Sequence, residues 1–447
     1  MRPMTGREPM SDKRDRQSPS GKKPVGKILL ISYFFPPTAG GGVFRPLAMV
    51  KYLSQLGWDI TVLTATKPKH YPSDEDLRKN VSREIKVVRV PVVWEGSWFR
   101  RLLGKLGLGW ISKSLLTPDE RIFWAEKACN EAKRLYATEK YDLIYATGPP
   151  FSIILAGLWL KRMKGINAKF VAEFRDPWTI SPYLSLSNPH QKRFADDTEL
   201  DIMAKADAVI MVTPGFVKKM SEKYPDDAPK IKCVQNGFDE DDFQDLPVRD
   251  DWRNESCMIV ASGTVFGKNN MDDFVAALEN IRKEDQSTWS KISVRFQGLP
   301  DVRLNRRLLE SGLTERCKSR GFVTHAENIR DLVTADLLIL PVSPSRNSEG
   351  HIPSRTYEYL ASGAQVLAIC EDGDLSELVG RFPQVRRVVP GDIDGIVREL
   401  KDVVAVWESG EYSYIPDPNE LRNLTRKARA KEIDAIFRDL IDQRGKD

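Results

Sequence analysis

Short apolar runs alternate with longer amphipathic stretches along most of the chain. Such runs, rich in β-branched residues and spaced by helical patterns, are typical of parallel strands that are buried on both faces of a sheet. The pattern therefore predicts an α/β fold built from strand–helix units. The expected strands are Lys27–Tyr33, Asp59–Thr64, Val87–Val93, Tyr141–Ala146, Lys169–Phe174, Ala208–Thr213, Lys232–Val234, Cys257–Ser262, Ile292–Gly298, Leu337–Pro341 and Val366–Ile369.

The alternation stops at an acidic and polar stretch with one proline, residues 240–253, which is typical of a linker. A chain of 447 residues is long for one domain, so two domains are expected. We predict one Rossmann-like domain at 25–240, a second at 254–420, and a helical segment at 421–447. Residues 1–24 are rich in Lys, Arg, Ser and Pro and lack an apolar run, which predicts a disordered basic tail and no secretory signal.

Composition excludes several classes of protein. The five cysteines are scattered and never form C-x-x-C, so a disulfide framework or a zinc site is not expected and a cytoplasmic location fits. The net charge of +5 is too small and diffuse to indicate nucleic acid. The triplet Asp372–Asp374 has spaced carboxylates, but it precedes a helical pattern, and helix capping explains it better than a metal. No metal or cofactor is expected.

Residues 94–116 form a basic stretch with apolar residues at helical spacing and tryptophans near its ends. Such a helix can lie in a membrane interface, so peripheral contact with the inner face of a membrane is one interpretation. The other is that the apolar face packs on the protein, and Gly104, Gly107 and Gly109 favour this second interpretation because they weaken a regular helix.

Two glycine-rich turns each follow an expected strand and precede an expected helix. The first contains Gly41 and Gly42, and the second runs from Gly263 through Thr264 to Lys268. Strand, glycine turn and helix in this order are typical of nucleotide-binding folds, in which glycine lets the backbone approach a phosphate or a sugar. Neither turn is G-x-G-x-x-G, so a dinucleotide site is a weak match. Lys268 could reach a phosphate as a point charge, although loop lysines are often only solvated.

A third loop, Glu349–Gly363, lies between two expected strands. Ser354 follows a proline and is a plausible helix cap, so that the backbone amides of the first turn would point outward. Arg355 lies in that first turn, where a cation opposes the helix dipole unless a phosphate lies between them. Glu358 follows one turn later, where its carboxylate could accept hydrogen bonds from two hydroxyl groups. An ordinary solvated helix start remains the alternative.

Arg175 and Asp176 come directly after the expected strand Lys169–Phe174. Ligands of open α/β sheets bind outside the carboxyl ends of the strands, so both side chains are placed for function. A structural ion pair in the loop is the alternative.

Several of these segments resemble motifs of one family, in the order that the family would show. The segments are Pro36–Arg45, Glu173–Trp178, Gln235–Asp239 and Pro353–Gly363. They look like the motifs of GT-B glycosyltransferases of the family 4 type, and the resemblance extends from about Lys27 to Leu440. It implies two Rossmann-like domains that face a central cleft, with the acceptor on the first domain, the donor on the second, and the terminal helix crossing back onto the first.

The resemblance also implies roles for individual residues. The glutamate that matches Glu358 holds the ribose of the donor, and the basic residue that matches Arg355 lies by the diphosphate. A second glutamate, which faces the donor sugar in many members, is shifted here by one position to Glu349, and His351 lies beside it. Where many members carry an arginine after the second glycine turn, this chain has Thr264, so Lys268 and Arg355 would share the neutralisation of the phosphates.

The implied activity is metal-independent transfer of a sugar, of the hexosyltransferase type, from a nucleotide diphosphate donor to an acceptor hydroxyl. A UDP-sugar is the expected donor, and a saccharide or lipid-linked acceptor of bacterial polysaccharide or glycan synthesis is the expected partner. The family precedent is retention of anomeric configuration, in which Asp176 orients; with inversion, Asp176 would be the base. The alternatives are a non-catalytic sugar-nucleotide-binding scaffold and a sugar-nucleotide epimerase of the same fold.

Overall fold

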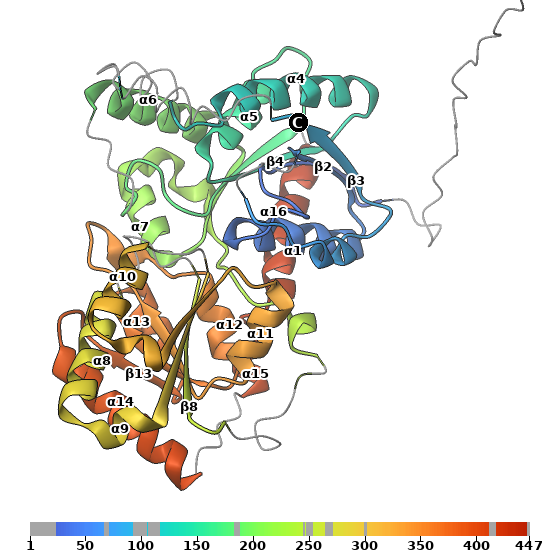
Figure 1. Ribbon diagram of the computed structural model, residues 1–447. Coiled ribbons are helices and arrows are strands. Elements are labelled where there is room, and N and C mark those ends of the chain that lie inside the picture. Colours follow the sequence, from blue (N-terminus) through green and yellow to red (C-terminus); the bar gives the residue numbers. More distant parts are fainter. Residues whose placement is uncertain are drawn as a thin grey trace, which may run out of the picture.

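The computed structural model describes residues 24–66, 71–92, 105, 117–182, 188–244, 246, 254–263, 271–298, 302–410 and 417–444. These residues fold into two domains, each built around a parallel sheet with helices on both faces (Figure 1). The predicted α/β architecture is therefore confirmed. Residues 1–23 of the predicted tail and the segment 94–116, apart from Lys105, lie outside the described residues.

The N-terminal sheet has seven strands in the order β3-β2-β1-β4-β5-β6-β7. Because β1 lies between β2 and β4, the order reverses there, and the carboxyl ends of β1 and β4 border a crevice where ligands of such sheets bind. The strands are β1 (Lys27–Ile31), β2 (Asp59–Ala65), β3 (Lys86–Val90), β4 (Leu143–Gly148), β5 (Lys169–Phe174), β6 (Ala208–Met211) and β7 (Ile231–Cys233). The helices are α1 (Gly41–Gln55), α4 (Ile122–Thr138), α5 (Phe151–Lys161), α6 (Pro189–Lys205) and α7 (Pro214–Lys223), with 3₁₀ turns at Asp76–Asn80, Pro225–Lys230 and Glu240–Phe243.

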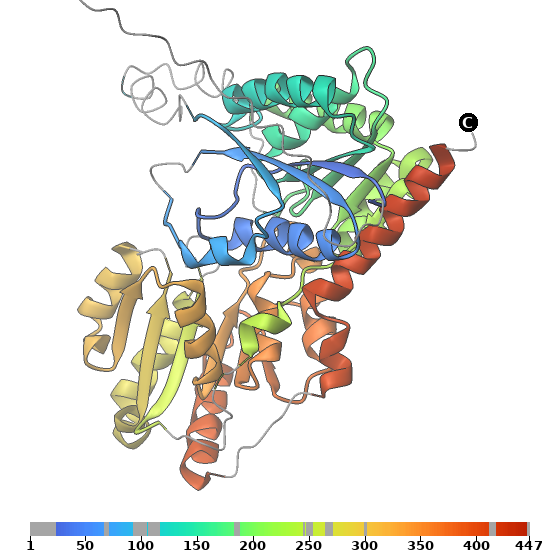
Figure 2. The ribbon, with the colours of Figure 1, turned by 90° about the vertical axis from the view of Figure 1, so that its right-hand side faces the viewer.

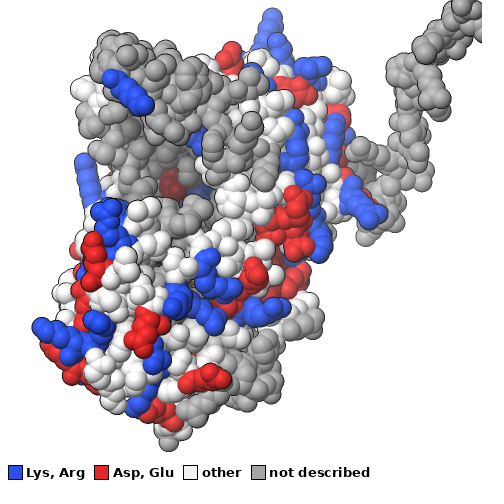
Figure 3. Space-filling view, in the orientation of Figure 1, with Lys and Arg blue, Asp and Glu red and all other residues white. Residues whose placement is uncertain are grey.

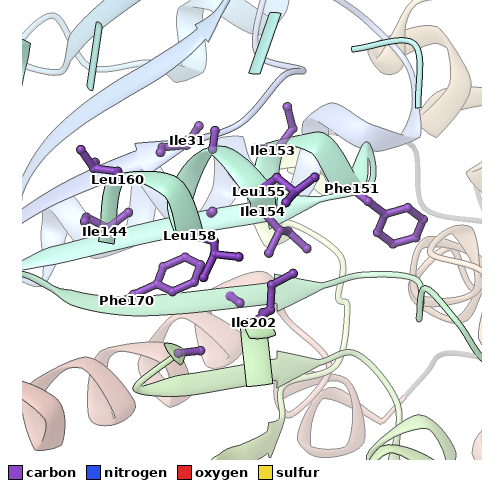
Figure 4. Close-up of a cluster of buried hydrophobic side chains, with 14 of the residues drawn as sticks. Ile31, Ile144, Phe151, Ile153, Ile154, Leu155, Leu158, Leu160, Phe170 and Ile202 are labelled. Atoms are coloured by element: carbon purple, nitrogen blue, oxygen red, sulfur yellow. The ribbon is translucent and has the colours of Figure 1, made fainter. Parts of the chain in front are cut away.

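Helix α5 is apolar on nearly every side because it is buried between the sheet and its neighbouring helices. Figure 4 shows its side chains packed against the sheet residues Ile144 and Phe170 and against Ile202 of α6. A Cβ on Gly157 would lie 2.6 Å from the Phe170 ring, so glycine allows this close approach of helix and sheet. The packing fixes the start of α5 and so the preceding Pro149 and Pro150, which line the interdomain cleft.

The C-terminal sheet has six strands in the order β10-β9-β8-β11-β12-β13, and its switch point lies between β8 and β11. The strands are β8 (Cys257–Ser262), β9 (Ile292–Gln297), β10 (Cys317–Gly321), β11 (Leu337–Pro341), β12 (Gln365–Ile369) and β13 (Val385–Val388). The helices are α8 (Asp272–Glu284), α9 (Gln286–Lys291), α10 (Val302–Glu310), α11 (His325–Val333), α12 (Arg355–Ala361), α13 (Asp374–Val379) and α14 (Ile393–Ser409), with 3₁₀ turns at Leu313–Glu315 and Ser348–Gly350.

The chain ends with α15 (Pro418–Arg422) and α16 (Arg426–Arg444). Helix α16 lies along the N-terminal domain (Figure 2) and buries Ala430, Ile433, Phe437 and Leu440 in a core that it shares with α1. The two interdomain connections pair with each other, because the Phe238 amide donates to the Leu424 carbonyl at 3.2 Å and the Arg426 amide donates to the Phe238 carbonyl at 2.7 Å. No helix within the described ranges has the length and apolarity that a membrane span requires.

Candidate active site between the domains

A cleft of about 750 Å³ separates the two domains. Figure 3 shows a hollow between them, with acidic and basic side chains inside it. The N-terminal domain contributes the turn before α1 and the loops after β4 and β5, and the C-terminal domain contributes the loops after β8 and β9 and the start of α12. The volume lies in the range of small-molecule sites.

Most of the predicted site residues lie on the walls of this one cleft. They are Gly41, Gly42, Arg175, Asp176, Gly263, His351, Ser354, Arg355 and Glu358. Thr264 and Lys268 lie outside the described residues. Residues that are far apart in the sequence meet here because both sheets direct the carboxyl ends of their central strands toward the cleft.

The structure does not bring Glu349 together with these residues. Its carboxylate accepts a hydrogen bond from the Lys219 ammonium of α7, and its side chain is 52% exposed. The hydrogen bond from Lys219 lowers the pKa of Glu349. The described residues that line the main cleft do not include Glu349, which instead joins the two domains at their rim.

The predicted cap at Ser354 is wrong. The backbone of Ser354 is already helical, with φ −59° and ψ −31°, and its side chain makes no capping hydrogen bond. A capping side chain needs an extended backbone to reach the amides of the first turn, and the helical backbone of Ser354 directs the hydroxyl elsewhere.

The guanidinium of Arg355 lies against the second glycine turn. A Cβ on Gly263 would lie 2.8 Å from Arg355 Nη1, so glycine makes room for this side chain. Nη2 donates a long hydrogen bond of 3.4 Å to the Pro341 carbonyl, and Nε is buried with no hydrogen-bond partner in the described part of the chain. A buried donor without a partner is costly, and an anion in the cleft would satisfy it.

Glu358 lies one turn further along α12 and is 6% exposed. Its Oε1 accepts a hydrogen bond of 2.8 Å from Nη2 of Arg426, the first residue of α16. Sequence reasoning missed Arg426, because the two residues are 68 positions apart and no local pattern links them.

A second interdomain contact adjoins this pair. The His325 ring lies 4.3 Å from the Phe44 ring, centroid to centroid, and His325 Nε2 is 2.8 Å from Asp242 Oδ2. Burial alone would lower the pKa of His325, but the hydrogen bond and the charge of Asp242 outweigh burial and raise it. Phe44 of the N-terminal domain and His325 of the C-terminal domain therefore line the same part of the cleft.

Arg175 connects the backbone segments that form the N-terminal wall of the cleft through hydrogen bonds. Its guanidinium donates to the carbonyl of Gly42 at 2.7 Å, to that of Gly148 at 3.2 Å and to that of Pro149. Burial lowers its pKa. Arg175 thus fixes the first glycine turn and the start of α5, and Asp176 lines the cleft beside it.

The triplet Asp372–Asp374 does not cap its own helix as predicted. The Gly373 amide bonds to the Ser376 hydroxyl at 3.0 Å, and Asp374 Oδ2 accepts a hydrogen bond of 2.7 Å from the Gly215 amide at the start of α7. Asp374 therefore links the two domains. Within the described residues, no group of three His, Cys, Asp or Glu side chains could hold a metal ion.

Comparisons with known proteins agree with this geometry. Residues 40–237 match the family model of the glycosyl transferase 4-like domain. No curated protein sequence matches the chain. Sucrose-phosphate synthase from Thermosynechococcus elongatus superimposes with a TM-score of 0.69 at 16% identity over 94% of this chain and 100% of that one.

Two further solved structures share the fold. WaaG, a glycosyltransferase involved in lipopolysaccharide biosynthesis, has a TM-score of 0.61 at 12% identity over 90% of this chain and 98% of that one. A TarM variant of S. aureus was solved in complex with fondaparinux, alpha-GlcNAc-glycerol and UDP. It has a TM-score of 0.61 at 11% identity over 92% of this chain and 99% of that one. Residues 40–237 therefore match the glycosyl transferase 4-like family that their motifs indicated, and the whole chain shares the fold of these solved structures.

Proposed function

We propose that this protein transfers a sugar from a nucleoside diphosphate donor to an acceptor hydroxyl, with the nucleotide held by the C-terminal domain. The observation that carries the proposal is the guanidinium of Arg355, which lies against Gly263 with a buried Nε that has no partner among the described residues. A diphosphate in the cleft would supply the missing acceptors. The same cation would stabilise the charge that develops on the leaving diphosphate.

Other predicted donor residues would complete this site. Glu358 would accept hydrogen bonds from the ribose, and Gly263 would let the backbone approach the phosphates. Thr264 and Lys268 belong to the proposed donor loop, where Lys268 would share the neutralisation of the phosphates with Arg355.

The N-terminal wall would present the acceptor. Asp176 lines the cleft beside Arg175, whose hydrogen bonds hold this loop against the first glycine turn. In a reaction that retains the anomeric configuration, Asp176 would orient the acceptor hydroxyl. If the reaction inverts the configuration, Asp176 is the residue placed to take the proton.

For the donor we propose a UDP-sugar, with a hexose as the transferred group. TarM was solved with UDP, and WaaG acts in lipopolysaccharide biosynthesis. These relatives support a saccharide or lipid-linked acceptor and a role in bacterial polysaccharide or glycan synthesis. The proposal includes a cytoplasmic location, and peripheral membrane contact through residues 94–116 stays the alternative to packing of this stretch on the protein.

A second candidate is a sugar-nucleotide-binding protein of the same fold without transferase activity. The placement of Glu349 favours it, because this carboxylate pairs with Lys219 and does not face the donor site. Both candidates bind a nucleotide sugar, so turnover separates them.

A thermal-shift screen against UDP-, GDP-, ADP-, CMP- and dTDP-sugars tests the donor site. A donor at 100 times its dissociation constant stabilises a protein by about 2.7 kcal/mol. We expect one nucleotide class to raise the melting temperature of the wild type and to leave that of Arg355→Ala unchanged. A response to none of the five, or an equal response of wild type and variant, would overturn the proposal.

A further inference from the structure

We propose that Arg426 is a positioning residue of the donor site: it holds the Glu358 carboxylate in the orientation that receives the ribose of the donor. The inference rests on the proposed function, because it needs a nucleotide in the cleft. Arg426 would act through Glu358, without requiring contact with the reacting atoms.

The pair formed by Glu358 and Arg426 is buried, with 6% and 7% of the two residues exposed. A carboxylate in such a place is costly unless a cation and hydrogen bonds compensate it. Arg426 Nη2 supplies both at 2.8 Å, and it uses only Oε1 of the carboxylate. No described residue donates to Oε2, and Glu358 lines the cleft. The pair therefore leaves acceptor capacity for hydroxyl groups.

Ribose hydroxyls match that capacity. An ionised carboxylate only accepts hydrogen bonds, and two neighbouring hydroxyls can donate to it together. A rotated carboxylate would turn its free oxygen away from the hydroxyl groups. Arg426 prevents this rotation because its hydrogen bond fixes Oε1.

Arg426 is itself held from several sides. Its Nη1 lies 3.5 Å from Asp242 Oδ2, and its guanidinium carbon lies 5.4 Å from the centroid of the Phe44 ring. Its backbone amide donates to the Phe238 carbonyl at 2.7 Å. These contacts fix the guanidinium without help from Glu358, as a positioning group requires.

The position of Arg426 also links the two domains. It begins α16, which packs on the N-terminal domain, whereas Glu358 lies on α12 of the C-terminal domain. The orientation of the proposed ribose-binding carboxylate thus depends on a helix of the opposite domain.

Calorimetric titration of the full-length protein with UDP, GDP and ADP, and with their 2′-deoxy and 3′-deoxy counterparts, tests this inference. In the wild type, we expect loss of a hydroxyl that bonds to Glu358 to weaken binding roughly ten-fold. In Arg426→Gln, the ribonucleotide should bind roughly ten-fold more weakly. The ratio of the dissociation constant of the deoxynucleotide to that of the ribonucleotide should then approach one. Arg426→Lys, which keeps the charge, should recover part of the ratio.

Arg438→Gln is the matched control. Arg438 lies on the same helix, pairs with Asp434 at 2.9 Å and lies 6.0 Å from the Trp58 ring, away from the cleft lining. Its variant should keep the wild-type ratio. A wild-type ratio in Arg426→Gln, or in Arg426→Lys if the glutamine variant does not fold, would overturn the inference and leave the proposed function standing. If no nucleoside diphosphate binds the wild type, the proposed function fails and this inference fails with it.

Discussion

Arg45 Nη2 lies 2.8 Å from Glu173 Oε2, and both side chains are almost fully buried beneath the cleft. Glu173 also accepts hydrogen bonds of 2.6 Å from the hydroxyls of Tyr145 and Thr147. Burial alone would raise the pKa of Glu173, but the charge and hydrogen bonds of Arg45 outweigh burial and lower it. The pair joins α1 to β5 and so fixes the first glycine turn relative to the loop of Asp176.

Removal of one partner of this pair should destabilise the N-terminal domain strongly. Arg45→Met leaves the Glu173 charge buried without its cation, a change that costs about 3–5 kcal/mol of unfolding free energy. Urea denaturation measures the effect. The control is Arg134→Met, which removes a cation that is 82% exposed and pairs with Glu131, so it should cost less than about 1 kcal/mol. Similar costs for the two variants would contradict this account of the pair.

Arg355 should contribute to ligand binding and not to the stability of the unliganded protein. Its Nε is buried without a partner among the described residues, so Arg355→Met removes an unsatisfied donor and should leave the unfolding midpoint unchanged or slightly higher. The same variant should lose the stabilisation that the donor gives. Melting curves with and without donor measure both effects, and a loss of more than about 2 kcal/mol without ligand would show that Arg355 is structural.

Gly263→Ala should weaken donor binding. Gly263 has φ +105°, and the new Cβ would lie 2.8 Å from Arg355 Nη1, so the guanidinium must move. Gly165→Ala is the control, because Gly165 has φ +85° but no heavy atom lies within 4 Å of the place that its new Cβ would take. Both substitutions strain the backbone by about 1 kcal/mol. Only Gly263→Ala should raise the dissociation constant of the donor in a titration, and equal effects would argue against the contact.

The contribution of His325 to stability should depend on pH. Its folded-state pKa is raised above the ordinary value of 6.5, because the hydrogen bond and charge of Asp242 outweigh burial. A group with a raised folded-state pKa stabilises most below its unfolded-state pKa, and it loses this contribution as the pH rises through the folded-state value.

His325→Gln should therefore destabilise more near pH 5.5 than near about pH 9. Urea unfolding of wild type and variant at the two pH values gives the comparison. A cost that is constant or grows with pH would show that the charged form of His325 does not hold the domains together.

The strands were the most predictable part of the structure. β5 and β8 have the bounds that their apolar runs predicted, because a strand buried on both faces carries a local signal. The helix expected from Leu421 is instead divided into α15 and α16, and the break at residues 423–425 lies where the chain pairs with Phe238. That pairing is a tertiary contact, which local periodicity does not record.

The candidate site was predictable only in part, for the same reason. Arg355 and Glu358 lie within one short motif, whereas Arg426 and His325 join the site through contacts that span 68 and 83 positions. Glu349 lies near the motif in sequence, yet Lys219 of the other domain holds it away from the cleft. Charge pairing between the domains decides these placements, and a single sequence does not show which charges meet.

The release of nucleoside diphosphate from a donor tests the central claim most directly. Phosphorus NMR would follow each sugar nucleotide that binds, first with water alone as acceptor and then with a mixture of mono- and oligosaccharides and lipid-linked saccharides. The account predicts that the wild type converts one donor to its nucleoside diphosphate, faster with an acceptor, and that Arg355→Ala does not. Binding without release would support the scaffold, isomerisation with the diphosphate link intact would support an epimerase, and either result would contradict a glycosyltransferase.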